Sequence, residues 1–319
     1  MKLQTQIPLK NQSSNQIDYH SNILLLGSCF VENIGKKIDY YKFQNCLNPT
    51  GILFHPIALE CLMSNAIKGK VFTEKDVFFL NEQWHCFEAH SKLSNSSKEA
   101  LLRDLNRSVK QTNKQIHDAT HIVITLGTAW VYKHIESDSI VANCHKVSQK
   151  QFTKELLSIK AIEKALQNAV ATIRTVNPTA SIVFTVSPVR HLKDGFVENT
   201  QSKAHLITAI HQLLSNQMQP RNLNYFPSYE IMLDELRDYR FYKEDMIHPN
   251  AVAVNYIWEK FQRVWISSEA QKTMCDVEAI QKGIQHKPFN LNSDAHQQFL
   301  QQLEEKQKVL QSKFSHIIF

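Results

Sequence analysis

Three short, continuous apolar runs constrain the fold of this chain of 319 residues more than any other feature of its sequence. They cover residues 22–26, 121–126 and 181–186, and each is followed by a glycine or a serine. Continuous runs of mostly apolar residues, rather than runs that alternate apolar and polar residues, are typical of strands buried on both faces of a parallel sheet. Helix-length segments separate the runs, and this alternation predicts an α/β fold in which helices flank a parallel sheet.

Periodic apolar spacing places the other elements of this fold. A fourth strand is predicted near residues 223–226, and an apolar stripe at positions 253, 257, 261 and 264 predicts a late helix. Further helices are predicted at about 56–68, 97–118, 151–175 and 200–218.

Two segments depart from this alternation. Residues 69–96 hold short apolar groups between polar turns, which predicts an insertion of small strands or irregular loops. Residues 294–314 form an amphipathic helix that we expect to dock onto the domain or onto a second subunit. We therefore expect a main domain over residues 1–266 and a helical C-terminal extension over residues 267–319, and the sequence leaves the oligomeric state open.

Charge and cysteine content argue against several classes of protein. Lysine and arginine total 36 against 30 acidic residues. This excess is spread along the chain, without the basic stripe or recognised module of a nucleic-acid-binding protein. The six cysteines include no CxxC pair. No run approaches the roughly 18 apolar residues of a membrane span, and the first residues lack the apolar core of a signal peptide. We expect a cytoplasmic protein with reduced thiols, no nucleic-acid partner and no membrane span.

The residues that directly follow the predicted strands are candidates for chemistry, because parallel α/β sheets form active sites at the carboxyl ends of their strands. Gly27 and Ser28 follow the first strand, and the glycine permits a sharp turn that presents the serine hydroxyl above the sheet. The surrounding residues match neither a Gly-x-Ser-x-Gly elbow nor a phosphate-binding or dinucleotide fingerprint, so no cofactor is expected. Ser28 is then either a nucleophile or the N-cap of the following helix.

A nucleophilic serine needs a base, and the segment before the late helix offers one. Asp245 and His248 are three residues apart, so both can project from one turn toward the same point. The histidine would accept the serine proton while the carboxylate fixes its tautomer. Pro249 disfavours an α conformation at His248 and can open the next helix. The alternative is that the Asp/His pair only caps that helix.

Gly27-Ser28-Cys29-Phe30, together with Asp245-x-x-His248-Pro249, resembles the GSCFA-domain proteins, a bacterial branch of the SGNH/GDSL-like hydrolase superfamily. The resemblance spans roughly residues 20–265, although Val31 stands where the family name has alanine. It implies a three-layer fold of the SGNH/flavodoxin-like type. Four further segments match: Asn48-Pro49-Thr50-Gly51, Thr125-Leu126-Gly127-Thr128-Ala129-Trp130, Asn143-Cys144-His145-Lys146 and Ser187-Pro188-Val189-Arg190-His191.

The resemblance implies a role for each matching residue. Ser28 resembles the nucleophile, His248 the general base and Asp245 the acid that orients the base. In the superfamily, the backbone N–H groups of the serine and of a glycine help to stabilise the oxyanion, and Gly51 is the candidate for that glycine.

The third oxyanion donor of the superfamily is an asparagine side chain, and this chain departs from that pattern. The segment after the second predicted strand contains Thr128 but no asparagine. Thr128 could donate through its hydroxyl, or Asn48 or His191 could substitute. Losing one oxyanion donor costs about 2.7–4 kcal/mol in well-studied enzymes, so ester hydrolysis depends on such a replacement.

The other matching residues each have two interpretations. Cys144 and His145 could line the site, or the histidine could only satisfy local backbone groups. Arg190 could pair with an anionic group of a substrate or with a surface acid. The histidines lack the tight paired spacing of a metal site, so no metal is expected. Nothing in the sequence indicates the lowered thiol pKa that a Cys29 or Cys144 nucleophile would need.

These observations predict a serine-dependent hydrolase or acyltransferase that acts on an ester through a Ser-His-Asp triad. The superfamily suggests a small-molecule or carbohydrate ester as its substrate. Two alternatives remain. One is a non-catalytic ligand-binding protein on the same fold, which the missing asparagine motivates, and the other is a metallohydrolase.

Overall fold

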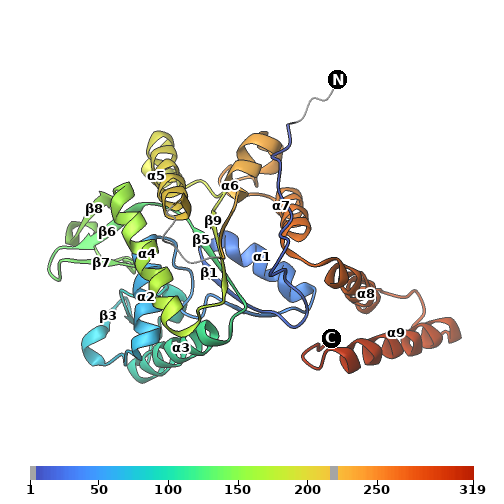
Figure 1. The fold of residues 1–319 in the computed structure, drawn as a ribbon. Coiled ribbons are helices and arrows are strands. Elements are labelled where there is room, and N and C mark those ends of the chain that lie inside the picture. The colour runs from blue at the N-terminus through green and yellow to red at the C-terminus, as the bar shows by residue number, and fades with distance from the viewer. Residues whose placement is uncertain (1–4, 216–221) are drawn as a thin grey trace.

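The computed structural model describes residues 5–215 and 222–319 and is built around a parallel sheet of five strands (Figure 1). The strand order is β10-β9-β5-β1-β2. This is the doubly wound order in which the second strand of the sheet lies outside the first and the later strands follow on the other side. The strands are β1 (Asn22–Gly27), β2 (Gln44–Leu47), β5 (His121–Leu126), β9 (Ser181–Val186) and β10 (Leu223–Phe226).

Helices cover both faces of this sheet, as predicted (Figure 1). Alternate residues of β1 point into two separate apolar cores. Ile23 and Leu25 pack with α1 and α7 on one face, while Leu24 and Leu26 pack with α2, α4 and α5 on the other. The three-layer α/β architecture is therefore confirmed. The helices named here are α1 (Cys29–Tyr40), α2 (Pro56–Lys68), α4 (Ile159–Val176), α5 (Phe196–Ser215) and α7 (Ala251–Trp265).

The predicted insertion at residues 69–96 contains a small hairpin, formed by β3 (Phe78–Leu80) and β4 (Gln83–His85). Its apolar residues pack against α3 (Lys98–Asp118) rather than against the sheet.

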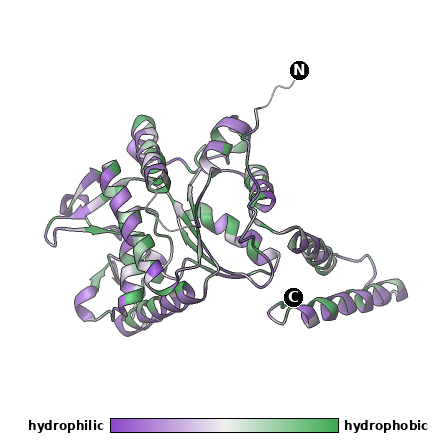
Figure 2. Cartoon of the chain, in the orientation of Figure 1, coloured by the Kyte–Doolittle hydropathy of each residue, from purple (hydrophilic) through white to green (hydrophobic). Residues whose placement is uncertain are grey.

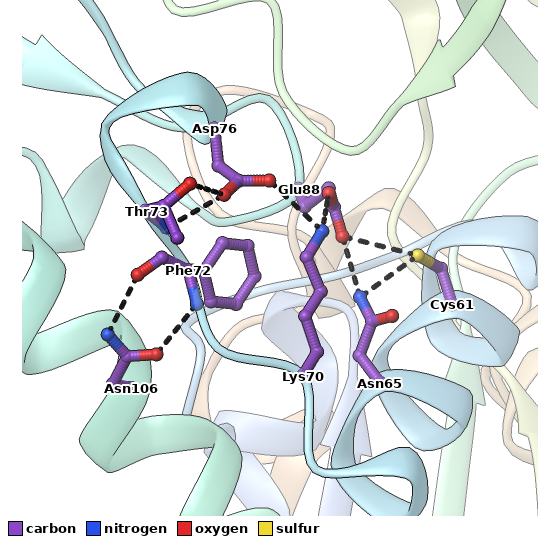
Figure 3. A network of polar contacts seen from close by, with 8 residues as sticks. All are labelled: Cys61, Asn65, Lys70, Phe72, Thr73, Asp76, Glu88 and Asn106. Atoms are coloured by element: carbon purple, nitrogen blue, oxygen red, sulfur yellow. Dashed lines mark hydrogen bonds and ion pairs between the residues drawn. The ribbon is translucent and has the colours of Figure 1, made fainter.

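Polar contacts fix the insertion to its neighbouring helices (Figure 3). Asn106 of α3 accepts a hydrogen bond from the backbone N–H of Phe72 (2.8 Å) and donates one to its carbonyl oxygen (3.1 Å). Glu88 accepts from Asn65 of α2 (2.6 Å) and pairs with Lys70.

A second small sheet follows β5 and corrects one prediction. It contains β6 (Trp130–His134), β7 (Ser139–Val141) and β8 (Phe152–Leu156), all antiparallel. The helix predicted over 151–175 is wrong at its start, because residues 152–156 pair with β6 and α4 begins only at Ile159. Packing of Phe152 in a cluster with Val141 and Val147 decides the conformation there.

The other predicted elements agree closely with the structure. The late helix is α7, and the strand near 223–226 is β10. α5 begins at Phe196, earlier than the predicted residue 200, and residues 216–218 of that prediction lie outside the described residues.

The C-terminal region is helical and packs onto its own chain. α8 (Ser268–Gln285) follows α7, and α9 (Asp294–Lys313) lies beside α8 at the edge of the molecule (Figure 1). Leu303 and Leu310 of α9 are buried, whereas most of this helix is hydrophilic (Figure 2). Phe314 lies 4.9 Å from Tyr19, measured between ring centroids. Across residues 5–215 and 222–319, no helix has the length and hydropathy to cross a membrane.

The segment before β1 is joined to the segment after α7. The backbone N–H of Ile17 donates to the carbonyl oxygen of Trp265 (2.7 Å), and the N–H of Ser267 donates to the carbonyl oxygen of Ile17 (3.0 Å). These bonds form a short parallel bridge between Ile17 and Ile266, which we call the closing seam. It joins the beginning and the end of the main domain.

Candidate active site

Ser28 lies at the carboxyl end of β1, between β5 and β2, where the strand order of the sheet reverses. Doubly wound folds bind ligands at this point. Gly27 has a φ of 134°, and a Cβ atom there would lie 2.1 Å from the carbonyl oxygen of Thr125. Only glycine therefore allows the chain to turn so close to β5. The N–H of Ser28 donates to the same oxygen (3.0 Å).

The side chain of Ser28 does not behave as a helix cap. Ser28 occupies the N-cap position of α1, but its hydroxyl accepts no hydrogen bond from the first turn of that helix. The Oγ atom is buried and has no hydrogen-bond partner among the described residues. Buried hydroxyls nearly always have a partner, so this unpartnered oxygen marks the position as a candidate site.

Asn48 and Thr50 bring two more buried polar atoms to this strand end. The side-chain oxygen of Asn48 accepts from the N–H of Gly27 (2.9 Å), which holds the carboxamide beside the turn that carries Ser28. Its Nδ2 atom and the Oγ1 atom of Thr50 are buried without a partner in the part of the chain that the structure describes.

His191 brings a fourth such atom from the other side of β5. Its Nε2 atom is buried and unpartnered within the described ranges. It lies 3.2 Å from the position that a Cβ atom of Gly127 would occupy, at the end of β5. Burial, followed by the charges of Lys203 and His248, lowers the pKa of His191 to about 3. The imidazole is therefore neutral and lies within electrostatic reach of His248.

Asp245 and His248 form the contact that their spacing predicts. The Nδ1 atom of His248 donates to the Asp245 carboxylate (2.7 Å), which also accepts from the N–H groups of Ile247 and His248 (2.9 Å each). These bonds, led by the one from the His248 N–H, lower the pKa of Asp245 to about 2. The carboxylate thus fixes the tautomer in which Nε2 of His248 is free to accept a proton.

The alternative that Asp245 and His248 cap α7 is wrong. Asn250 is the N-cap, and its side-chain oxygen accepts from the N–H of Ala253 (3.1 Å). Its amide nitrogen donates to the carbonyl oxygen of Arg240 (2.6 Å), which ties the loop to the preceding turn. An asparagine just before a helix is a usual cap signal, and it could have been found in the sequence.

The loop with Asp245 and His248 is linked to the other strand ends through the segment after β9. The N–H of Arg190 donates to the carbonyl oxygen of Ile247 (3.2 Å). The Oγ atom of Ser28 makes no hydrogen bond to His248 or to any other described residue. No hydrogen bond therefore closes the expected triad among the described residues of this structure.

The oxyanion donors expected from the resemblance are engaged elsewhere. The N–H of Gly51 donates to the carbonyl oxygen of Asn48 (2.8 Å). Thr128 Oγ1 accepts from the N–H of Trp130 (3.1 Å) and is bonded to the Ser202 hydroxyl (2.9 Å). The Asn48 carboxamide, in contrast, has an amide nitrogen that no described residue engages.

Arg190 and His145 have structural partners. The guanidinium carbon of Arg190 lies 4.1 Å from the centroid of the Tyr242 ring, an intramolecular cation–π contact. The Nε2 atom of His145 donates to the carbonyl oxygens of Cys86 (2.7 Å) and Ala89 (3.1 Å) and so holds the insertion in place. The interpretation of His145 as a partner of local backbone groups is confirmed.

Cys144 lines a cavity of about 170 Å³ together with Phe54 and Trp130. Burial raises the pKa of its thiol to about 11, and burial also raises the pKa of Cys29. Both shifts disfavour the thiolate that a cysteine nucleophile requires. Within residues 5–215 and 222–319, no three His, Cys, Asp or Glu side chains come together as a group that could hold a metal ion.

Two residues at this edge of the sheet escape sequence reasoning. Thr50 lies in the segment Asn48-Pro49-Thr50-Gly51, which resembles the GSCFA-domain proteins, and this resemblance is the one sequence signal for a role of Thr50. Lys203 of α5 is buried and donates to the carbonyl oxygens of Gly127 (2.6 Å) and Ser187 (2.8 Å). A lysine in a helix is usually exposed, and nothing in the sequence distinguishes this one.

Comparison with protein families identifies two matching regions. Residues 22–261 match the GSCFA family, and residues 277–319 match the C-terminal domain of GSCFA domain proteins. No curated protein matches the chain. The first region covers well over half of the sequence and includes Ser28, Asp245 and His248. The protein belongs to the GSCFA family.

Proposed function

We propose that this protein is a serine-dependent esterase or acyltransferase of the SGNH type, with Ser28 as the nucleophile. The observation that carries the proposal is the buried Ser28 hydroxyl, which lies at the ligand-binding edge of the sheet with no partner among the described residues. A binding role alone would leave the carboxylate-oriented imidazole of His248 unexplained.

In the proposed reaction, Nε2 of His248 takes the proton of the Ser28 hydroxyl as the serine oxygen attacks the ester carbonyl. Asp245 keeps the imidazole oriented and stabilises its charged form. The leaving alcohol then takes the proton from His248, and an acyl-serine remains. Water, or the hydroxyl of an acceptor, gives its proton to His248 as it attacks the acyl-serine. His248 returns this proton to Ser28, and the acyl group leaves as an acid or as a new ester.

The Asn48 carboxamide is the proposed replacement for the missing asparagine of the superfamily. Its oxygen is held by the N–H of Gly27, and its amide nitrogen is buried and unpartnered among the described residues. That nitrogen can donate to the oxyanion that forms when Ser28 attacks. An acylated carbohydrate is the substrate class that the superfamily resemblance suggests.

The test compares wild type with Ser28→Ala for hydrolysis of p-nitrophenyl acetate and for labelling by a fluorophosphonate. We expect Ser28→Ala to reduce kcat by about 10³-fold or more and to abolish the label, which peptide mapping should place on Ser28. Ser108→Ala is the matched control, because Ser108 is also buried but lies in α3. Equal hydrolysis by wild type and Ser28→Ala would rule out the serine mechanism.

One observation favours a second candidate, a ligand-binding protein without catalysis. The N–H groups of Ser28 and Gly51 both donate to backbone oxygens. In that case wild type would neither hydrolyse esters nor react with the fluorophosphonate.

A further inference from the structure

Lys203 is a buried lysine whose hydrogen bonds, among the described residues, go only to backbone. It is 1% exposed. In the described part of the chain, its Nζ atom donates to the carbonyl oxygens of Gly127 and Ser187, not to a carboxylate. The ring centroid of Tyr229 lies 5.7 Å from the same atom. Burying an ammonium group without a counter-charge costs several kcal/mol, so stability alone does not account for a lysine here.

The position of this ammonium group links it to the candidate active site. Gly127 directly follows β5 and Ser187 directly follows β9, so Nζ lies at the carboxyl ends of two central strands. Its charge reaches Cys29, the neighbour of Ser28, and also reaches His191. The amino group of Lys203 thus lies at the same edge of the sheet as Ser28, which follows β1.

We infer that Lys203 is a positioning residue of the active site, which fixes the ends of β5 and β9 and, in its protonated form, places a positive charge at the edge of the sheet where the oxyanion would form. This inference rests on the proposed esterase function. Negative charge develops on the carbonyl oxygen of the substrate when Ser28 attacks. A fixed cation stabilises that charge more strongly in a buried site than in water, and it needs no reorganisation during the reaction.

The positive charge, rather than the two hydrogen bonds alone, distinguishes lysine at this position. Burial lowers the pKa of Lys203 to about 7, while Cys29 acts in the opposite direction. A glutamine can donate to carbonyl oxygens but carries no charge. An arginine keeps the charge, whereas a methionine removes both the charge and the hydrogen bonds. The three substitutions therefore separate electrostatic and structural roles.

The experiment measures kcat and KM for p-nitrophenyl acetate in Lys203→Gln, Lys203→Met and Lys203→Arg, each well below its Tm. We expect the glutamine and methionine variants to lose about 10²–10³-fold in kcat with KM changed less than threefold. A fall in kcat with almost unchanged KM indicates that an interaction made only in the transition state has been lost. Lys203→Arg should retain more kcat than Lys203→Gln.

The control is Lys260→Met, which removes the other buried lysine. Lys260 lies in α7 and is paired with Glu235 (2.9 Å). Loss of the lysine should therefore lower Tm and leave kcat unchanged. Wild-type kcat in folded Lys203→Gln would overturn the inference, even if Lys203→Met fails to fold. A wild type that neither hydrolyses the ester nor labels at Ser28 would instead overturn the proposed function, and this inference with it.

Discussion

The Asp245 carboxylate accepts hydrogen bonds from two backbone N–H groups and from the His248 ring, all within a stretch of four residues. Each of these bonds is stronger to the charged carboxylate than to the neutral acid, which is why the pKa of Asp245 falls from 3.8 to about 2. The stabilisation of the loop is therefore complete above pH 3.8 and is lost as the pH falls toward 2.

We predict that acidification from pH 4 to pH 2 releases the His248 ring from Asp245, as followed by NMR of the His248 side chain. At neutral pH, Asp245→Asn should reverse the direction of this hydrogen bond and reduce kcat by about 10⁴-fold, because an amide favours the wrong tautomer of the imidazole. Asp238→Asn is the matched control, since Asp238 is an exposed acid with a lowered pKa that faces Arg240 instead. Equal losses in the two variants would contradict this role of Asp245.

For single residues, the sequence predicts contacts between near neighbours in the chain well and contacts between distant residues poorly. Three residues separate Asp245 from His248, so one turn is enough to bring them together. The free amide of Asn48 depends on its bond to Gly27, a neighbour only because β2 pairs with β1. Lys203 contacts the strand ends through the packing of α5, which no motif encodes.

At the scale of elements, burial on both faces determines what the sequence predicts. β1, β5 and β9 are buried along almost their whole length and carry mostly apolar residues, so their positions were predictable to within a residue. β2 (Gln44–Leu47) is a short edge strand in which only Cys46 is buried, and its polar sequence gives no strand signal. Pairing with β6 likewise overrides the helical pattern of residues 152–156.

The insertion allows a test of whether its hydrogen bonds to α3 stabilise it locally. Asn106→Ala removes both hydrogen bonds to the backbone of Phe72 (Figure 3). We expect faster hydrogen exchange across residues 71–96, equivalent to about 1–3 kcal/mol of lost local stability, with the central sheet unaffected.

The control for this prediction lies on the same helix. Asn113→Ala removes one hydrogen bond, to the carbonyl oxygen of Ala66 in α2, and should leave exchange in residues 71–96 unchanged. Equal exchange changes in the insertion and the sheet would show that the two are not separate units.

At the scale of the whole molecule, Glu235 connects segments far apart in the sequence. Its carboxylate accepts from the Lys260 ammonium (2.9 Å), the Tyr256 hydroxyl (2.5 Å) and the backbone N–H of Ile7 (2.7 Å). The Glu235 side chain is fully buried. This one group therefore joins the start of the chain to α7.

We predict that Glu235→Gln lowers the free energy of unfolding by about 3–5 kcal/mol, because it leaves the Lys260 charge buried without its partner. Urea unfolding measures the change. Glu278→Gln breaks an exposed pair with Lys282 (2.7 Å) and should cost about 0–1 kcal/mol. The double variant Glu235→Gln/Lys260→Met should be more stable than Glu235→Gln alone, and a lower stability would contradict this account.

The closing seam can form only late in protein synthesis, because it joins residues from the two ends of the main domain. Ile17 leaves the ribosome long before Trp265 and Ser267, the residues whose backbone groups bond to it. At roughly 5–20 residues per second, that interval is on the order of 10–50 s. Ser28 emerges early and His248 late, so a nascent chain carries the proposed nucleophile without its base. Any acyl chemistry at this site therefore begins only after almost all of the main domain has been made.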